Sequence, residues 1–272
     1  MIIWRKPHQW WREVRVLRTL FTNWPLAVRH YYRLLAPSSP AVATFEMRNG
    51  TVFHVDPGWI DVSVLKSIWG DRIYETFPGF APEPGWQVLD LGAHKGGFAL
   101  LAAAAGADVL AVEPEAHNLR LLRRNLAHNQ VKTVRVWEGA VAGTSGQGDL
   151  LRRDSWSHGL EPHPDDPAGL VRDPVTLASL DDLVAETGPV VDLVKLDVEG
   201  AELAAFRAAS PATLATIRRI VLEYHPVGDL TDEAVGRELG RLLDAAGFRA
   251  RFYPYNTIFA DRISKDTAPV AR

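Results

Sequence analysis

The stretch VLDLGAHKGGF, residues 88–98, decides the fold, because an apolar strand turns there through glycines into an Ala/Leu-rich segment. In an open α/β sheet, the end of the first strand is where a nucleotide-like cofactor lies against backbone amides. Glycines at that place let the chain turn tightly and approach a ligand closely, since they carry no Cβ. The stretch therefore predicts a cofactor site at the end of a parallel strand.

An acid follows the next apolar strand. Residues 108–112 predict this second strand, and Glu113 comes directly after it. A carboxylate at that position can accept hydrogen bonds from both hydroxyls of a ribose. Together with the glycines, it indicates a nucleoside.

The spacing of the glycines separates two kinds of nucleoside cofactor. A dinucleotide fingerprint has the spacing G-x-G-x-x-G, because a pyrophosphate must sit on the helix N-terminus. Here the pattern is D-x-G-x-x-x-G, formed by Asp90, Gly92 and Gly96. The acid would repel a pyrophosphate, whereas it suits a cationic cofactor such as S-adenosylmethionine. A dinucleotide site and a purely structural glycine turn are the alternatives.

Composition bounds the class of protein. A chain of 272 residues, 47% of them hydrophobic, suits one α/β domain with an extension. The sequence has no cysteine, which excludes disulfides and thiol chemistry. Neither a long apolar run nor a signal-peptide pattern occurs, so we expect a cytoplasmic protein.

Charge is distributed unevenly along the chain. The formal net charge is -3, yet residues 1–36 hold seven basic residues and the single acid Glu13, a net charge of +6, which leaves -9 for the rest. No basic stripe is visible in that acidic remainder, so nucleic acid is not an expected partner.

The basic segment has a helical pattern. Its apolar residues recur at steps of three and four from Trp10 to Leu35, which places them on one helix face. Pro25 is expected to break this helix, with Asn23 as N-cap of a second one. Three interpretations remain open: two helices that dock on the domain or on a neighbouring subunit, an interfacial helix on an anionic membrane or partner, or a disordered tail.

Turn signals and polar stretches divide the chain into four predicted parts. The dipeptide Asn49-Gly50 between apolar runs predicts a hairpin, followed by a helix near residues 63–69. Polar residues 143–173 show little periodicity and are expected to form a long loop on the substrate side. The parts are a basic Trp-rich helical extension (1–40), a small β/α cap (41–80), a cofactor-binding domain (81–262) and a tail (263–272).

Strands and helices alternate through the main domain, which predicts a parallel sheet. The expected strands are 86–91, 108–112, 132–137, 190–196 and 219–223, and helices are expected at 180–186, with Ser179 as cap, and 232–246, with Thr231 as cap. A terminal hairpin, 248–260, would add antiparallel strands. A NAD-type sheet is parallel throughout, so this pattern favours a class I methyltransferase, a Rossmann-like α/β fold with a seven-stranded, mostly parallel sheet.

Two strand ends carry a second set of polar residues. Because carboxyl ends of parallel strands face the ligand crevice, we expect these side chains at one rim. Lys195 is expected to pair with a neighbouring acid, and Glu202 to lie on a solvated helix face. The rim residues are Asp197, Glu199, Glu223 and His225.

At this point the chain resembles the FkbM family of S-adenosylmethionine-dependent methyltransferases. The resemblance covers roughly residues 50–262, and KLDVEGAE, residues 195–202, is its most specific part. The family loop commonly reads G-A-N-x-G, and His94 stands here at the Asn position. The other matching segments are 88–98, 112–114, 176–181, 192–194 and 222–225.

The resemblance implies methylation of a hydroxyl on a small molecule, a sugar or a glycan. It implies that Gly92, Ala93 and Gly96 contact the amino-acid end of the cofactor and that Asp90 orders their loop. Glu113 would bind the ribose, and Gly139 and Ala140 would frame the adenine.

An alcohol needs a base or a metal to take its proton. His225 is the first candidate base, because its ordinary pKa lies near 6.5. Asp197 is the second, as base or as orienter of His225. Glu199, two residues beyond Asp197, is the third catalytic candidate. A Mg²⁺ site on Asp197, Glu223 and His225 is an alternative. Two rival functions are a NAD(P)-dependent oxidoreductase and a non-catalytic cofactor-binding module.

Overall fold

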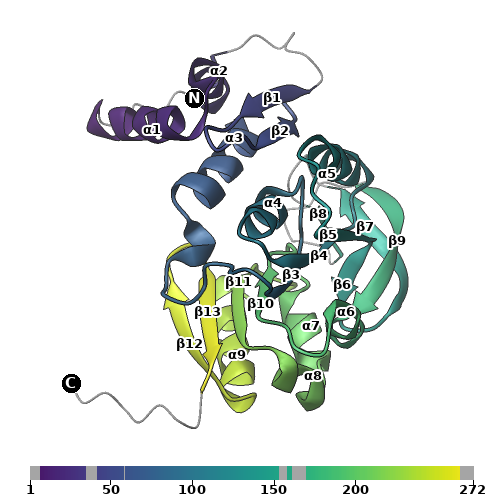
Figure 1. Cartoon of the computed structure of the whole chain (residues 1–272). Coiled ribbons are helices and arrows are strands. Elements are labelled where there is room, and N and C mark those ends of the chain that lie inside the picture. The colour runs from purple at the N-terminus through teal and green to yellow at the C-terminus, as the bar shows by residue number, and fades with distance from the viewer. Residues whose placement is uncertain (1–6, 35–41, 58, 153–157, 161–169, 264–272) are drawn as a thin grey trace, which may run out of the picture.

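A computed structural model describes residues 7–34, 42–57, 59–152, 158–160 and 170–263. Its centre is a seven-stranded sheet in the order β12-β13-β11-β10-β3-β4-β5 (Figure 1). Neighbouring strands from β11 to β5 run parallel, whereas β13 pairs antiparallel with both β11 and β12. The prediction of a mostly parallel α/β sheet is therefore confirmed. The strands are β3 Gln87–Leu91, β4 Asp108–Glu113, β5 Val134–Glu138, β10 Leu193–Leu196, β11 Arg219–Glu223, β12 Phe248–Tyr253 and β13 Thr257–Arg262.

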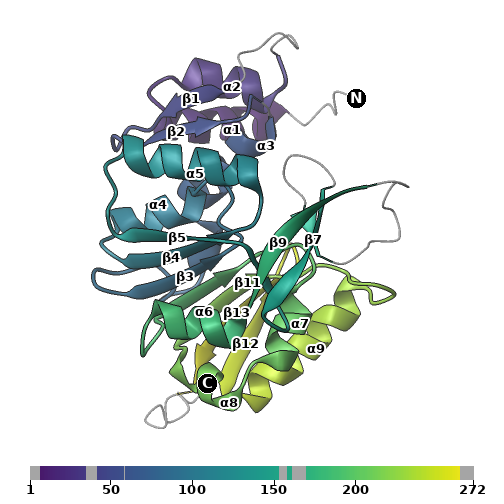
Figure 2. The same cartoon turned by 90° about the vertical axis from the view of Figure 1, so that its right-hand side faces the viewer.

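Helices cover both faces of this sheet (Figure 2). Successive residues of a strand point to opposite faces, and β3 shows this clearly. Val88 packs with α4 and α5 in one core, while Leu89 packs with α6, α7 and α9 in the other. The predicted caps of α6 and α9 are confirmed, because Ser179 and Thr231 accept backbone N–H bonds there. The helices are α4 Gly97–Ala104, α5 Ala116–His128, α6 Leu180–Thr187, α7 Glu202–Ala208, α8 Pro211–Thr216 and α9 Asp232–Ala245.

The cap begins with the predicted hairpin. Strand β1, Ala43–Glu46, pairs antiparallel with β2, Val52–Val55. Two asparagine side chains one turn apart, from Asn125 on α5 and from its C-cap Asn129, bind the free edge of β2. Asn125 bonds the N–H and C=O of His54, and Asn129 those of Val52. These amides replace a neighbouring strand and fix the hairpin to the domain. Helix α3, Trp59–Leu65, then continues as the π-helical turn η1, Lys66–Gly70, and the 3₁₀ turn η2, Ile73–Glu75.

The N-terminal helices pack on the cap. Helices α1, Pro7–Leu20, and α2, Trp24–Tyr31, bury Leu17 and Phe21 of the predicted stripe. This matches the first of the three interpretations, docking on the rest of the chain. Asn23 precedes α2, but its side chain does not cap the helix, because it bonds to the C=O of Thr44 and the N–H of Glu46 on β1. Among the described residues, no helix combines the length and apolarity needed to cross a bilayer.

The prediction of a long loop at residues 143–173 is wrong for the part of that range that the structure describes. Strands β7, Gly146–Arg152, and β9, Val171–Ser179, pair antiparallel in a second sheet, with β6, Ala140–Ala142, and β8, His158–Gly159, on its two edges. These strands are largely exposed and bury few apolar side chains, so they lack a clear alternation of apolar and polar residues. Residues 153–157 and 161–169 of the expected loop lie outside the described residues, as do residues 264–272 of the expected tail.

Candidate active site

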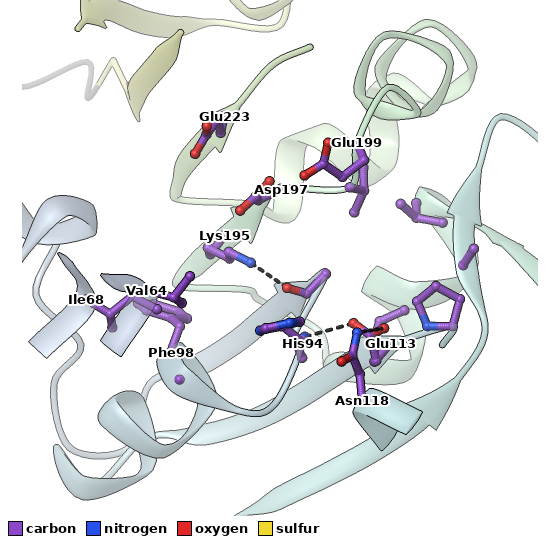
Figure 3. Close-up of a pocket in the computed structure, with 18 of the residues that line it drawn as sticks. Val64, Ile68, His94, Phe98, Glu113, Asn118, Lys195, Asp197, Glu199 and Glu223 are labelled. Atoms are coloured by element: carbon purple, nitrogen blue, oxygen red, sulfur yellow. Dashed lines mark hydrogen bonds between the residues drawn. The ribbon is translucent and has the colours of Figure 1, made fainter. Parts of the chain in front are cut away.

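A cavity lies at the carboxyl ends of β3, β4, β10 and β11, with the cap on one side (Figure 3). Gly92, Ala93, Glu113, Gly139 and Ala140 line it, so these five predicted cofactor-binding residues come together. Gly159 and Leu160 of the second sheet line it as well.

Glycine is required at two places in the cavity wall. A Cβ on Gly92, which has a φ of +78°, would lie 1.8 Å from the carbonyl oxygen of Asp197. A Cβ on Gly139 would lie 2.4 Å from the carbonyl oxygen of Thr176. The missing side chains therefore let the ends of neighbouring strands close around the cavity. Gly96 differs, because it starts α4 in a left-handed conformation and does not line the cavity.

The carboxylate of Glu113 is held in place by N–H donors. It accepts bonds from the backbone N–H groups of His94, at 2.8 Å, and Glu115, at 3.0 Å, and from the side-chain amide of Asn118, at 3.2 Å (Figure 3). Burial raises the pKa of Glu113, while these donors lower it. The carboxylate therefore keeps a fixed orientation at the wall of the cavity.

Asn118 is a site residue that the sequence analysis missed. Its side chain is buried and lines the cavity, and its Oδ1 has no hydrogen-bond partner in the part of the chain that the structure describes. The bond from Nδ2 to Glu113 sets the direction of the amide. A buried carbonyl oxygen without a donor is costly, so this atom points to a ligand that donates. Its position five residues after Glu113 was the available signal.

Asp90 is connected to the glycine loop through Lys195, outside the cavity. It is fully buried, lies outside the cavity lining, and forms an ion pair of 3.3 Å with Lys195. Burial raises the pKa of Asp90, and Lys195 opposes that rise. Lys195 also donates to the carbonyl of Gly92 at 2.7 Å. Neither Asp90 nor Gly96 lines the cavity. Gly96 was expected to contact the cofactor there, whereas Asp90 was expected to order the loop, which it contacts through Lys195.

Lys95 connects the same loop to the cap. Its ammonium group is buried and lies 2.8 Å from Asp61 and 3.0 Å from Asp56. Both acids belong to the segment that leads into and along α3. His94, with a φ of 53°, lines the cavity and places its Nε2 3.2 Å from the Lys95 ammonium. The charge of Lys95 is therefore paired with acids of the cap rather than with a ligand.

The other end of the cavity is acidic. Asp197, Glu199 and Glu223 line it, as expected (Figure 3). Tyr74 from η2 lines it as well. The Tyr74 hydroxyl donates to Asp197 Oδ2 at 3.2 Å. Burial and the neighbouring charge of Asp197 raise the pKa of Glu223 to about 7. A carboxyl group with such a pKa is suited to act as a general base near neutral pH.

The surroundings of His225 do not favour it as the expected base. Its Nδ1 lies 2.8 Å from Glu202, and its Nε2 lies 3.7 Å from Glu199. Burial lowers the pKa of His225, but the bond to Glu202 and the nearby carboxylates outweigh burial and raise it to about 10. The imidazole is therefore already protonated at pH 7, and it lies outside the cavity lining.

Glu202 is the main reason why the pKa of His225 is raised. It is fully buried at the start of α7 and accepts N–H bonds from Val198 and Gly200 besides its contact with His225. The expectation of a solvated helix face for Glu202 is wrong.

Replacing His225 by Gln is expected to destabilise the protein in a pH-dependent way. A group whose folded-state pKa is raised contributes stability that is full below its unfolded pKa, near 6.5, and is lost as the pH rises through about 10. The difference in unfolding free energy between the two proteins should therefore be largest near pH 6 and shrink toward pH 10. Urea unfolding across that range measures it, and a difference that grows with pH would contradict the assignment.

The residues fit Mg²⁺ poorly. The expected ligands are Asp197, Glu223 and His225. His225 Nε2 lies 4.0 Å from Glu223, and its Nδ1 is hydrogen-bonded to Glu202. The ligand atoms of Asp197, Glu199 and His225 do lie within 4.8 Å of one another. However, Mg²⁺ favours oxygen ligands, and a metal at this place would have to displace the proton of His225.

The fold and the site define an α/β protein with a cavity at the carboxyl edge of its sheet. The family model described as the methyltransferase FkbM domain matches residues 90–250, and the chain belongs to this family. The predicted family resemblance is confirmed.

The chain is also 29% identical, over 226 residues, to the AMB antimetabolite synthetase AmbE of Pseudomonas aeruginosa. This match covers 68% of the chain but only 10% of that protein, so the chain spans about a tenth of its relative. Among solved structures, it is similar to a putative rRNA methylase from Clostridium thermocellum, with 11% identity, a TM-score of 0.45, and coverage of 73% of this chain and 96% of that one. It is also similar to the Methanococcus jannaschii fibrillarin pre-rRNA processing protein, with 12% identity, a TM-score of 0.45, and coverage of 83% and 84%.

Proposed function

We propose that the chain is an S-adenosylmethionine-dependent methyltransferase that methylates a hydroxyl group of a small-molecule, sugar or glycan acceptor. Membership of the FkbM methyltransferase domain family supports methyl transfer. One observation carries the rest: a single cavity joins the acceptor groups of Glu113 and Asn118 to the carboxyl of Glu223, whose pKa is raised to about 7.

The residues present fit the cofactor. Glu113 offers fixed carboxylate oxygens to ribose hydroxyls, and the unpartnered Oδ1 of Asn118 lies beside them. Gly92 and Gly139 line the cavity without side chains. Asp197 adds negative charge, which favours a cation. When bound, S-adenosylmethionine supplies a methyl group on a positively charged sulfur and leaves as S-adenosylhomocysteine.

The chain contributes a base at the acidic end. An alcohol has a pKa far above 7, so Glu223 accepts its proton as the new oxygen–carbon bond forms. Asp197, held by the Tyr74 hydroxyl, orients the acceptor hydroxyl toward Glu223. Because His225 carries its own proton, it acts on Glu199 and Glu202 as a fixed cation.

The acceptor contacts the cap. Val64 and Ile68, on the helical part of the cap, line the cavity together with Phe98 of α4 (Figure 3). Ile60 of α3 lines it as well. An acceptor with an apolar face beside its hydroxyl group would pack against this wall.

Transfer of a labelled methyl group tests the proposal. Purified protein is incubated with methyl-labelled S-adenosylmethionine and a panel of hydroxylated small molecules, sugars and glycans. We expect label in an O-methyl product, no change with EDTA or added Mg²⁺, and no NADH oxidation. Acceptor-dependent NADH oxidation without methyl transfer would support the oxidoreductase instead.

Replacing Asn118 by Ala is expected to weaken binding of S-adenosylhomocysteine roughly three- to tenfold, the range for losing one neutral hydrogen bond. Calorimetry measures the dissociation constant. A deoxyribose analogue of the ligand serves as control: if Oδ1 accepts from a ribose hydroxyl, the two losses should not add. Unchanged affinity in the variant would show that Oδ1 does not meet the cofactor.

A further inference from the structure

The outer face of α1 carries arginines and an exposed tryptophan. Trp11, Arg15 and Arg18 follow one another at steps of four and three, which places them on one helix face, and Arg12 flanks them. Trp11 is 65% exposed, and the three arginines are exposed. The opposite face holds the buried Leu17, so this outer face is not needed for packing.

These arginines differ from most others in the chain. Within the described ranges, none of Arg12, Arg15 and Arg18 forms an ion pair with an acid. The single acid of the basic segment, Glu13, binds the buried Lys66 at 2.7 Å and is withdrawn from the surface. Elsewhere, exposed arginines pair with carboxylates; examples are Arg123 with Glu138, Arg135 with Glu186, Arg152 with Asp173, Arg207 with Glu238, and Arg249 with Asp261.

We propose that this face of α1 binds the surface of an anionic phospholipid membrane. Arginines are attracted to anionic headgroups, and an exposed indole inserts at the boundary between headgroups and acyl chains. Trp11 favours a lipid surface over a nucleic-acid duplex, because the bases of a duplex are stacked on one another and leave no apolar environment for the indole.

Charge and shape set the orientation. The rest of the chain carries a net charge of -9 against +6 for residues 1–36, so an anionic surface attracts only the N-terminal end. Helices α1 and α2 lie at the end of the molecule opposite α8 and α9 in both views (Figures 1 and 2). The protein would therefore lie on a membrane through α1, with α8 and α9 on the side away from the membrane.

Sedimentation of the full chain with vesicles tests this proposal. We expect binding to vesicles of phosphatidylglycerol and phosphatidylcholine, none to phosphatidylcholine alone, and loss of binding near 1 M salt, where the screening length falls to about 3 Å. At roughly fivefold per arginine, the variant R12Q/R15Q/R18Q should bind about 100-fold more weakly. Trp11→Ala should weaken binding at every salt concentration.

A matched variant controls for net charge. R124Q/R237Q/R241Q removes the same charge from exposed positions on α5 and α9, and it should bind like the unchanged protein. Circular dichroism and thermal unfolding verify that each variant is folded. Equal loss in both triple variants, binding to phosphatidylcholine alone, no binding to either vesicle, or binding to duplex RNA without vesicle binding would overturn the proposal.

Discussion

Replacing Glu223 by Gln is expected to lower kcat by roughly 10²- to 10⁴-fold, the range for removing a general base. Glutamine keeps the size of the side chain but cannot accept the proton. The pKa of Glu223 is raised to about 7 by burial and by Asp197, and only the ionised form is active. The rate of the unchanged enzyme should therefore rise with pH through about 7 and level off above it.

Methyl transfer measured from pH 5 to pH 9 checks this prediction, and Glu186→Gln provides the control. Glu186 is exposed on α6, where it pairs with Arg135, so its replacement should leave the rate and the pH profile unchanged. Affinity for S-adenosylhomocysteine should stay the same in both variants. A Glu223→Gln enzyme that keeps its rate, or keeps the inflection near pH 7, would assign the base to another group.

Replacing Lys95 by Met is expected to lower the unfolding free energy by about 3–5 kcal/mol, the cost of removing one partner from a buried ion pair. Asp61 is nine-tenths or more buried, and Lys95 holds it at 2.8 Å. Burial raises the pKa of Asp61, and Lys95 opposes that rise. Without the ammonium group, the carboxylate must stay buried unpaired or take up a proton.

Urea unfolding measures this loss. Lys132 is exposed, so Lys132→Met should stay within about 0.5 kcal/mol of the unchanged protein. Adding Asp61→Asn to Lys95→Met removes the uncompensated charge and should restore part of the stability. If Lys95→Met is as stable as the Lys132→Met control, the link between the glycine loop and the cap is not the buried pair.

The main sheet could be predicted because its physical signals are local. Strands buried on both faces are continuous apolar runs, and the Asn49-Gly50 turn, the Ser179 cap and the Thr231 cap act within a few residues. The second sheet gave no such signal. Strands β7 and β9 stabilise one another mainly by pairing, and their few buried residues do not set a period.

That Gly92 and Glu113 line one cavity could be predicted for the same reason. Gly92 and Glu113 each follow a strand, and the topology of a parallel sheet brings strand ends together. Tyr74 could not be found this way, since it lies 123 residues from its partner Asp197 and depends on how the cap docks. The charge of His225 depends on the burial of Glu202, which only the packing of α7 reveals.

Calorimetric titration with S-adenosylhomocysteine and with NADH tests the central claim most directly. The account predicts saturable one-site binding of S-adenosylhomocysteine, weaker binding in Glu113→Gln because one fixed carboxylate oxygen becomes an amide, and no heat with NADH. Binding of NADH, or S-adenosylhomocysteine binding that is absent or unaffected by Glu113→Gln, would contradict it.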